Sequence, residues 1–408
     1  MDDKKVTLYG YRWLVLGVFA LINLVVQAQW LTFAPVATIA QGAYHATPLQ
    51  IDMLSIIFML AFIVFSIPAS YIIDTFGLRV GVGIAAVLVG VFGTLKGLFA
   101  DNYTIVFISQ TGLAIAQPLA TNAISKLSVH WFPKNERATA SGIASLAMYI
   151  GIALAMVLTP ILVNSIGGGT QLRGTLLIYG LVSLVAALLV LVFMRDRPKS
   201  PPVPGESEER FRVAEGLKYI FAQRSMIFII ILGFVLLGMF NSINTVIDQV
   251  GSMKGLSSDQ SGLIGGVMLI AGIIGAVVLP IFSDRQGRRR AYIILAIIGI
   301  FPGLLGLALL QSFVPVLISA FVLGFFMLGA APIVFQYSAE ITYPAPESSS
   351  QGMFLLAGNV SGAIFILGID GIGVNPLMIL FLVLAAICIV LSLKLKESSA
   401  ILPDPADN

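Results

Sequence analysis

The sequence has few of the residues that enzyme chemistry and disulfide frameworks require. Its one cysteine, Cys388, excludes a disulfide framework, a thiolate cluster and a CxxC redox pair. Its two histidines, His45 and His130, are too few for most zinc sites. No GxxxxGK[ST] segment is present, so direct use of ATP is not expected. We therefore expect no metal, no cofactor and no enzymatic activity.

Charged residues are also scarce. They make up 11% of the 408 residues, against about 25% in soluble domains, whereas 58% of the residues are hydrophobic. So few charges cannot cover a soluble globule, and the mean hydropathy of +0.98 indicates that the apolar excess faces lipid. The net charge of +3 is too small to suggest a nucleic-acid partner. The composition predicts an integral membrane protein whose partners are the bilayer and a small molecule.

Apolar runs of the length that crosses a bilayer recur along the whole chain. They lie near residues 13–39, 50–73, 80–99, 103–126, 138–163, 174–194, 226–249, 257–282, 291–310, 313–335, 349–369 and 376–393. We predict an all-α membrane protein with twelve transmembrane helices in two six-helix halves. Residues 1–195 form the first half, and residues 226–408 form the second with a short tail. Between them, 196–225 form a linker whose Pro-rich start precedes an amphipathic helix with Val213, Leu217, Ile220 and Phe221 on one face.

The positive charges predict the orientation of these spans. Of the 23 Lys and Arg residues, only Lys96, Arg173 and Lys254 fall in one of the two alternating sets of loops and helix ends. Because cytoplasmic loops carry the excess of Lys and Arg, we expect both termini in the cytoplasm and a multi-pass protein of the cytoplasmic (plasma) membrane. Nothing in the sequence indicates oligomerisation, so a monomer is expected.

Two pairs of loops indicate an internal repeat. The segment Asp74–Arg79 after span 2 matches Asp284–Arg290 after span 8 at a shift of 210, and Pro133–Arg137 matches Pro344–Glu347 at a shift of 211. Transporters are commonly built from such repeats. A DxxGRR loop joins a tight glycine turn to an acid that can cap a helix or pair with arginine. The residues expected to form cytoplasmic latches and an inner gate are Asp74, Gly77, Arg79, Glu136, Arg137, Asp284, Gly287, Arg288 and Glu340. In the alternative interpretation, the arginines only set the topology.

This doubled loop resembles the signature of the major facilitator superfamily, and the resemblance covers the whole chain. It implies the major facilitator fold, in which spans 1, 4, 7 and 10 line a substrate cavity between the two halves. Inside the spans the polar residues are mostly neutral. The side chains expected to hold the substrate are Trp30, Gln117, Asn122, Tyr149, Asn241, Gln336 and Asn359. Interhelical hydrogen bonding remains the alternative role for each of them. Lys96 lies near the outer end of span 3. The ordinary explanation for a lysine at this position is that its side chain snorkels to the membrane surface.

Further stretches resemble the feline leukaemia virus subgroup C receptor family. They are Tyr11–Trp13, Gln29-Trp30, Ile51–Leu60, Phe76–Arg79 and Val322–Pro344, with Ser348–Gly352 after it. The resemblance implies choline or ethanolamine transport, with haem also proposed for the family, and an aromatic cage to which Trp30 corresponds. Asn241 stands where that family has a tyrosine. Tyr149 and Asn359 lie near its glutamines, and Gln336 stands where a glutamate is expected.

We therefore expect a secondary transporter that moves a small polar or cationic organic solute, such as a choline-like amine, by alternating access, in the manner of a uniporter. The first alternative is a proton-coupled exporter of drugs or metabolites, which needs a titrating group in its cavity. The second, from another class, is a membrane receptor or sensor without turnover, which short outer loops disfavour. A membrane enzyme is the least favoured, because the spans show no catalytic carboxylate pair, His cluster or activated nucleophile.

Overall fold

The computed structural model describes residues 9–133, 136–167, 172–198, 223–342 and 347–397. The chain divides into two compact units, Met1–Glu208 and Glu209–Asn408. The point of division falls inside the linker expected over residues 196–225. The amphipathic helix expected there, at residues 213–221, lies outside the described residues.

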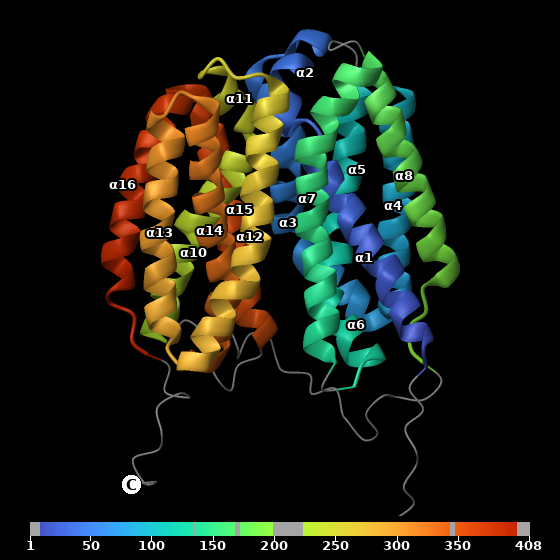
Figure 1. Ribbon diagram of the computed structural model, residues 1–408. Coiled ribbons are helices and arrows are strands. Elements are labelled where there is room, and N and C mark those ends of the chain that lie inside the picture. The colour runs from blue at the N-terminus through green and yellow to red at the C-terminus, as the bar shows by residue number, and fades with distance from the viewer. Residues whose placement is uncertain (1–8, 134–135, 168–171, 199–222, 343–346, 398–408) are drawn as a thin grey trace, which may run out of the picture. The chain divides into compact units, whose positions relative to one another are not determined.

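The first unit consists of helices (Figure 1). In chain order they are α1 (Tyr11–Trp30), the 3-10 helix η1 (Ala34–Val36), α2 (Ala37–Tyr44), α3 (Pro48–Phe76), α4 (Leu78–Leu98), α5 (Tyr103–Thr121), α6 (Ile124–Trp131), α7 (Arg137–Gly167) and α8 (Arg173–Phe193). The principal packing pairs are α4 with α8, α1 with α7, and α5 with both α3 and α4.

The second unit repeats this plan. Its helices are α10 (Arg224–Thr245), α11 (Ile247–Ser252), α12 (Ser258–Gln286), α13 (Arg289–Leu309), α14 (Phe313–Ile341), α15 (Glu347–Ile372) and α16 (Val374–Ser392). Here α14 packs against α12 and α13, and α10 packs against α15. Over the two units, 12 described helical segments are long and apolar enough to cross a membrane, which confirms the predicted span count.

Matching helix starts support the internal repeat. Thr47 and Gln50 form a capping box before α3, and Ser257 and Gln260 form the same box before α12, at the shift of 210. Both helices have 29 residues and end at a glycine with positive φ, 92° at Gly77 and 60° at Gly287. A left-handed backbone at these two positions favours glycine, which explains the residue in both copies of the loop.

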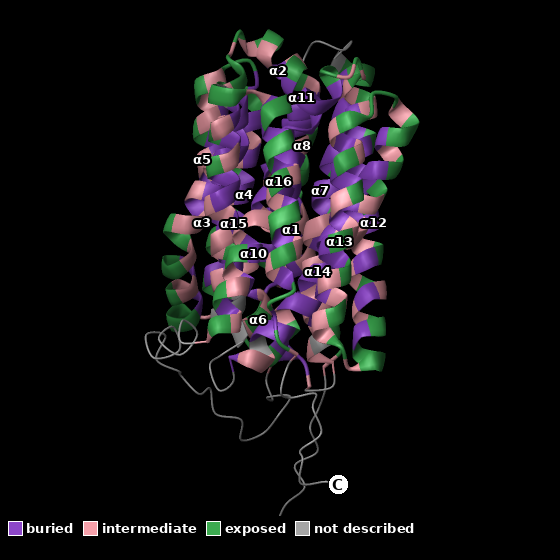
Figure 2. Ribbon diagram, turned by 90° about the vertical axis from the view of Figure 1, so that its left-hand side faces the viewer, coloured by how far each residue is buried: buried purple, intermediate pink, exposed green. Residues whose placement is uncertain are grey.

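Apolar side chains cover the outside of the helices as well as the inside. In Figure 2, exposed and buried residues alternate around single helices such as α16. The exposed residues on α8 and α16 include Leu181, Leu188, Val192, Ile379, Val383 and Val390. Each unit also has a buried apolar cluster, with Phe33, Leu54 and Val106 in the first and Ile297, Tyr337 and Phe354 in the second. Apolar surfaces on both sides of a helix are those of a lipid-facing bundle.

The first span is not a continuous helix. The run at 13–39 was expected to form one helix, but α1 ends at Trp30 and residues 31–33 are not helical. The chain then turns through η1, with Pro35 in its first turn, and continues as α2. Proline suits the first turn of a helix because its missing N–H has no helical partner there. The break places Trp30 at the C-terminal end of α1.

Candidate functional site

Trp30 lies at the break of span 1 and is anchored to the neighbouring helix α3. Its ring nitrogen Nε1 donates a hydrogen bond to the Ser55 carbonyl at 3.1 Å, and the Ser55 hydroxyl donates to the Trp30 carbonyl at 3.4 Å. The residue is buried, with 7% of its surface exposed. Because the single N–H of the indole is used by this anchor, the face of the ring is what remains for binding a solute.

A pair of glutamines lies on the helices next to this tryptophan. Gln117 of α5 donates from Nε2 to Oε1 of Gln27, one turn before Trp30 on α1, at 3.2 Å. Both side chains are buried. Within the described part of the chain, neither Nε2 of Gln27 nor Oε1 of Gln117 has a hydrogen-bond partner. The pair therefore offers one donor and one acceptor to a polar solute. Gln27 was not among the expected binding residues, and its spacing of three from Trp30 is the signal that could have identified it.

Tyr149 is separated from Trp30 along the helix axes. Gly151 of α7 approaches the Leu24 backbone of α1 so closely that a Cβ would collide with the Leu24 carbonyl. As odd-numbered spans, α1 and α7 run in the same direction. With a rise of about 1.5 Å per residue, Tyr149 then lies about 12 Å from Trp30 along the axes, toward the N-terminal ends of both helices. A solute that touches both must be elongated or must meet them in turn.

Asn122 forms hydrogen bonds between two helices. Its amide nitrogen lies 3.0 Å from the Ser66 carbonyl, 3.1 Å from the Ser66 hydroxyl and 3.0 Å from the Ser70 hydroxyl. These contacts connect the end of α5 to α3 close to Pro68, which lies inside that helix. These contacts match the alternative role stated above, interhelical hydrogen bonding. A role of Asn122 in binding the solute stays a prediction.

In the second unit one expected residue is hydrogen-bonded to the backbone next to another. Asn241 of α10 donates to the Gly358 carbonyl at 3.3 Å, immediately before Asn359 on α15, whose own amide donates to the Leu355 carbonyl at 3.0 Å. Gln336 of α14 is exposed and donates instead to Oε1 of Glu340 at 3.1 Å, one turn further along its helix. Among the expected residues of this unit, Asn241 and Asn359 therefore form one group, and Gln336 and Glu340 form another.

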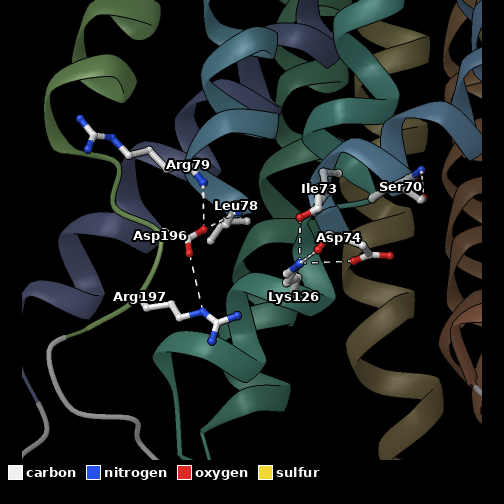
Figure 3. Close-up of polar contacts among 9 residues, drawn as sticks. Ser70, Ile73, Asp74, Leu78, Arg79, Lys126, Asp196 and Arg197 are labelled. Atoms are coloured by element: carbon white, nitrogen blue, oxygen red, sulfur yellow. Dashed lines mark hydrogen bonds and ion pairs between the residues drawn. The ribbon is translucent and has the colours of Figure 1, made fainter. Parts of the chain in front are cut away.

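The first expected latch has partners that the loop sequence did not indicate (Figure 3). Asp74 pairs with Lys126 of α6 at 3.4 Å, and Lys126 also donates to the Ile73 carbonyl at 2.8 Å. The side chain of Arg79 extends away from Asp74. Its backbone N–H and that of Leu78 donate to Asp196, at 3.4 and 2.6 Å.

Asp196 therefore caps the start of α4 and lies against Gly77, where a Cβ would meet its carboxylate. An acid directly after span 6 was the sequence signal for this contact. In the loop after α6, Glu136 pairs with Arg12 at 3.1 Å, while Arg137 donates to the Phe132 and Val129 carbonyls at 3.2 and 3.4 Å. The Arg12 guanidinium also lies 5.6 Å from the Trp13 ring and 6.0 Å from the Phe132 ring.

In the second copy of the loop, the arginine that forms ion pairs is one position from the one expected. Arg289, not Arg288, contacts both Asp284 and Glu340, the latter at 3.3 Å. Arg288 is exposed, and within the described residues only its backbone is hydrogen-bonded: its N–H donates to the Ser283 carbonyl at 3.3 Å, and its carbonyl accepts from the Tyr292 N–H at 3.4 Å. The reason is local, because the left-handed Gly287 ends α12 and the next helix begins at Arg289. Within this unit the ion pairs of the loop are therefore made by Arg289, and the role of Arg288 in a latch stays a prediction.

We expect Arg289→Met to lower the thermal stability of the purified protein by several degrees. The Arg289 and Glu340 side chains are only 13% and 12% exposed, and removing the arginine leaves a largely buried carboxylate unpaired. Such a loss costs about 3 kcal/mol. Differential scanning fluorimetry in detergent measures it, with Arg288→Met as the matched control that should change little. Equal shifts in the two variants would contradict the assignment.

Within the part of the chain that the structure describes, no three His, Cys, Asp or Glu side chains gather where they could hold a metal ion. The snorkelling interpretation of Lys96 is wrong, because the residue has no exposed surface. Its amine is bonded inside the first unit, next to the break of span 1.

Known proteins resemble this chain over most of its length. Solute carrier family 49 member A3 of Danio rerio is 29% identical, over 89% of this chain and 79% of that protein. The choline/ethanolamine transporter FLVCR2 of Homo sapiens is 27% identical, over 90% and 73%, and the choline/ethanolamine transporter FLVCR1 of Felis catus is 26% identical, over 89% and 68%.

A solved structure shares the fold. It is that of a bacterial homolog to the human lysosomal transporter Spinster, in an inward-facing and unoccupied conformation. It superimposes with a TM-score of 0.75 at 16% identity, over 98% of this chain and 100% of the other. The family pattern of the Major Facilitator Superfamily matches residues 19–366. The chain therefore belongs to the Major Facilitator Superfamily, a family of transporters, and is not an enzyme.

Proposed function

We propose that this transporter carries a small polar or cationic organic solute, of the choline or ethanolamine type, by alternating access and as a uniporter. The observation that carries the proposal is Trp30, whose N–H is bonded to α3, so that its ring face is the part of the side chain with which it would bind a ligand. The face of an indole attracts an ammonium group, and most strongly where water is excluded. Relatives whose names state choline and ethanolamine transport support the same class of solute.

The neighbouring groups fit a solute with a polar end. The Gln27–Gln117 pair supplies an amide N–H and a carbonyl oxygen, and these suit the hydroxyl of choline or ethanolamine. Asn241 and Asn359 would supply further neutral contacts from the second unit. These amide side chains do not titrate, so they can bind a solute without taking up or releasing a proton. This is the reason for proposing uniport rather than proton coupling. We also propose that the protein works as a monomer in the plasma membrane. The distribution of Lys and Arg supports placing both termini in the cytoplasm.

Counterflow in proteoliposomes tests this proposal. Vesicles loaded with unlabelled choline or ethanolamine should accumulate the labelled solute transiently, because a carrier exchanges it across the membrane. As a control for the cation, 3,3-dimethylbutanol has the shape of choline without its charge and should compete poorly. Absence of counterflow with both amines would contradict the solute class. Uptake that depends on an imposed pH gradient would instead favour the proton-coupled exporter.

A further inference from the structure

Lys96 is a lysine buried inside the membrane-spanning part of the first unit. It lies in the last turn of α4 and has no exposed surface. Its Nζ lies 3.1 Å from Oε1 of Gln110 and 3.4 Å from the Thr32 hydroxyl, and 5.4 Å from the centre of the Phe33 ring. No carboxylate of the described residues pairs with it. A buried ammonium without a counter-ion is costly in a membrane, so its presence calls for a function.

The partners of the amine can only accept hydrogen bonds from it. The Thr32 hydroxyl donates its own hydrogen to the carbonyls of Ala28 and Gln29, at 3.0 and 3.1 Å. The amide nitrogen of Gln110 donates to the carbonyls of Gln29 and Leu54, at 3.3 and 3.0 Å. Both groups therefore turn lone pairs toward Nζ, and the Phe33 ring adds the attraction of its face. This environment suits a donating amine, whose N–H groups match the two acceptors.

The amine also lies near the C-terminal end of α1, where it contacts Thr32. Because the chain leaves α1 after Trp30, the last carbonyls of that helix lose their helical partners. Thr32 and Gln110, the two residues bonded to Lys96, donate to those carbonyls. The C-terminus of a helix carries partial negative charge, and a cation nearby stabilises it. In this protein the Lys96 amine is connected to that end through Thr32 and Gln110, which both donate to the Gln29 carbonyl.

A short series of contacts connects the amine to Trp30. Gln110 holds the Leu54 carbonyl on α3, and the next carbonyl along α3, that of Ser55, accepts from the Trp30 ring. Gln110 also holds the Gln29 carbonyl, directly before Trp30. Removing the amine would therefore loosen both sides of the segment that carries the indole.

We propose that Lys96 is a positioning residue, a buried hydrogen-bond donor that holds the break of span 1 and thereby sets the orientation of the Trp30 ring. That Trp30 binds solute rests on the proposed function, whereas the positioning of its ring by Lys96 does not.

The fluorescence of Trp30 tests this role without any solute. The chain has three tryptophans, so replacing Trp13 and Trp131 with phenylalanine leaves Trp30 as the only emitter. In that background, Lys96→Ala should raise the acrylamide quenching constant of Trp30 about twofold or more, because the loss of the amine's hydrogen bonds frees the segment. The matched control is Lys254→Ala. Lys254 also donates to helix-terminal carbonyls, of Ala308 and Leu310 at 3.5 and 2.7 Å, but in the other unit.

Chemical rescue separates positioning from general damage. Ethylammonium should restore most of the original quenching in Lys96→Ala, because it can donate hydrogen bonds in the vacated space. Tetramethylammonium, which has the charge but no N–H, should not. Unchanged quenching in Lys96→Ala, or equal rescue by both cations, would overturn the proposal. If that variant does not fold, Thr32→Val removes one acceptor of the amine at nearly constant size. Quenching that is unchanged in Thr32→Val would then be the contradicting result.

The fluorescence test of Lys96 and the counterflow test of the proposed function can fail independently. If the parent protein shows no choline or ethanolamine counterflow but the fluorescence results hold, the solute class is wrong and the role of Lys96 stands. If counterflow occurs and Lys96→Ala leaves Trp30 unaffected, the transporter proposal stands and the positioning role is wrong.

Discussion

Replacing Trp30 with alanine is expected to reduce choline counterflow by about 30-fold or more while leaving the protein folded. A desolvated cation on an indole face gains about 2 kcal/mol, and each 1.4 kcal/mol is a factor of ten in affinity. The substitution removes this face at the end of α1 and leaves the Ser55 carbonyl without its donor. Counterflow in proteoliposomes, normalised to the amount of monodisperse protein inserted, measures the effect.

Two companion variants show which property of Trp30 matters. Trp30→Phe keeps a ring face and loses the N–H anchor, so it should retain part of the transport activity. Trp13→Ala is the control for removing a tryptophan, because Trp13 is 43% exposed and lies at the other end of α1. Near-normal counterflow in folded Trp30→Ala would show that the residue only packs.

The second large effect is expected at the contact between α12 and α14 in the second unit. Gly275 of α12 faces the Phe325 carbonyl, and Gly324 of α14 faces the Met268 carbonyl, each so closely that a Cβ would overlap the oxygen. Backbones approach in this way in membranes where small residues remove the side chain between them. The obstacle is backbone in both cases, so a rotamer change cannot relieve it.

Gly324→Ala should therefore destabilise the second unit by about 1–3 kcal/mol, and Gly324→Leu should prevent its folding. The apparent melting temperature and the monodisperse fraction in detergent report both results. Gly368→Ala is the matched control, because Gly368 lies in the helix α15 of the same unit with nothing within 4 Å of a Cβ. That change should be neutral or slightly stabilising, since alanine is the better helix former. Equal melting temperatures for Gly324→Ala and Gly368→Ala would contradict the tight contact.

Much of the fold was predictable because each membrane span can be identified from a short stretch of sequence. A span needs an apolar run and satisfies its own backbone, so hydropathy finds it without knowledge of its neighbours. The repeat was also readable, since Asp74-x-x-Gly77 and Asp284-x-x-Gly287 stand at a constant shift. The capping boxes at Thr47 and Ser257 follow the same shift, and they were present in the sequence as well.

The polar contacts were less predictable, because most are made with residues far away along the chain. The pairing of Asp74 with Lys126 rather than with Arg79 depends on how α6 returns beside α3. The choice of Arg289 over Arg288 depends on one left-handed glycine, which rotates the following residues relative to Asp284. The break after Trp30 lies in an apolar run, and hydropathy carries no information on backbone direction.

The sequence by itself determined that this is a transporter-like bundle of twelve spans, with Trp30 and neutral amides as its candidate binding groups. Only the tertiary structure decided that Lys96 is buried at the end of α1 rather than extended toward the surface. The physical reason is that burial and hydrogen bonding are properties of a position in space. The acceptors for the buried amine come from Thr32 and Gln110, 64 and 14 residues away along the chain, and they meet only when α1, α4 and α5 have packed.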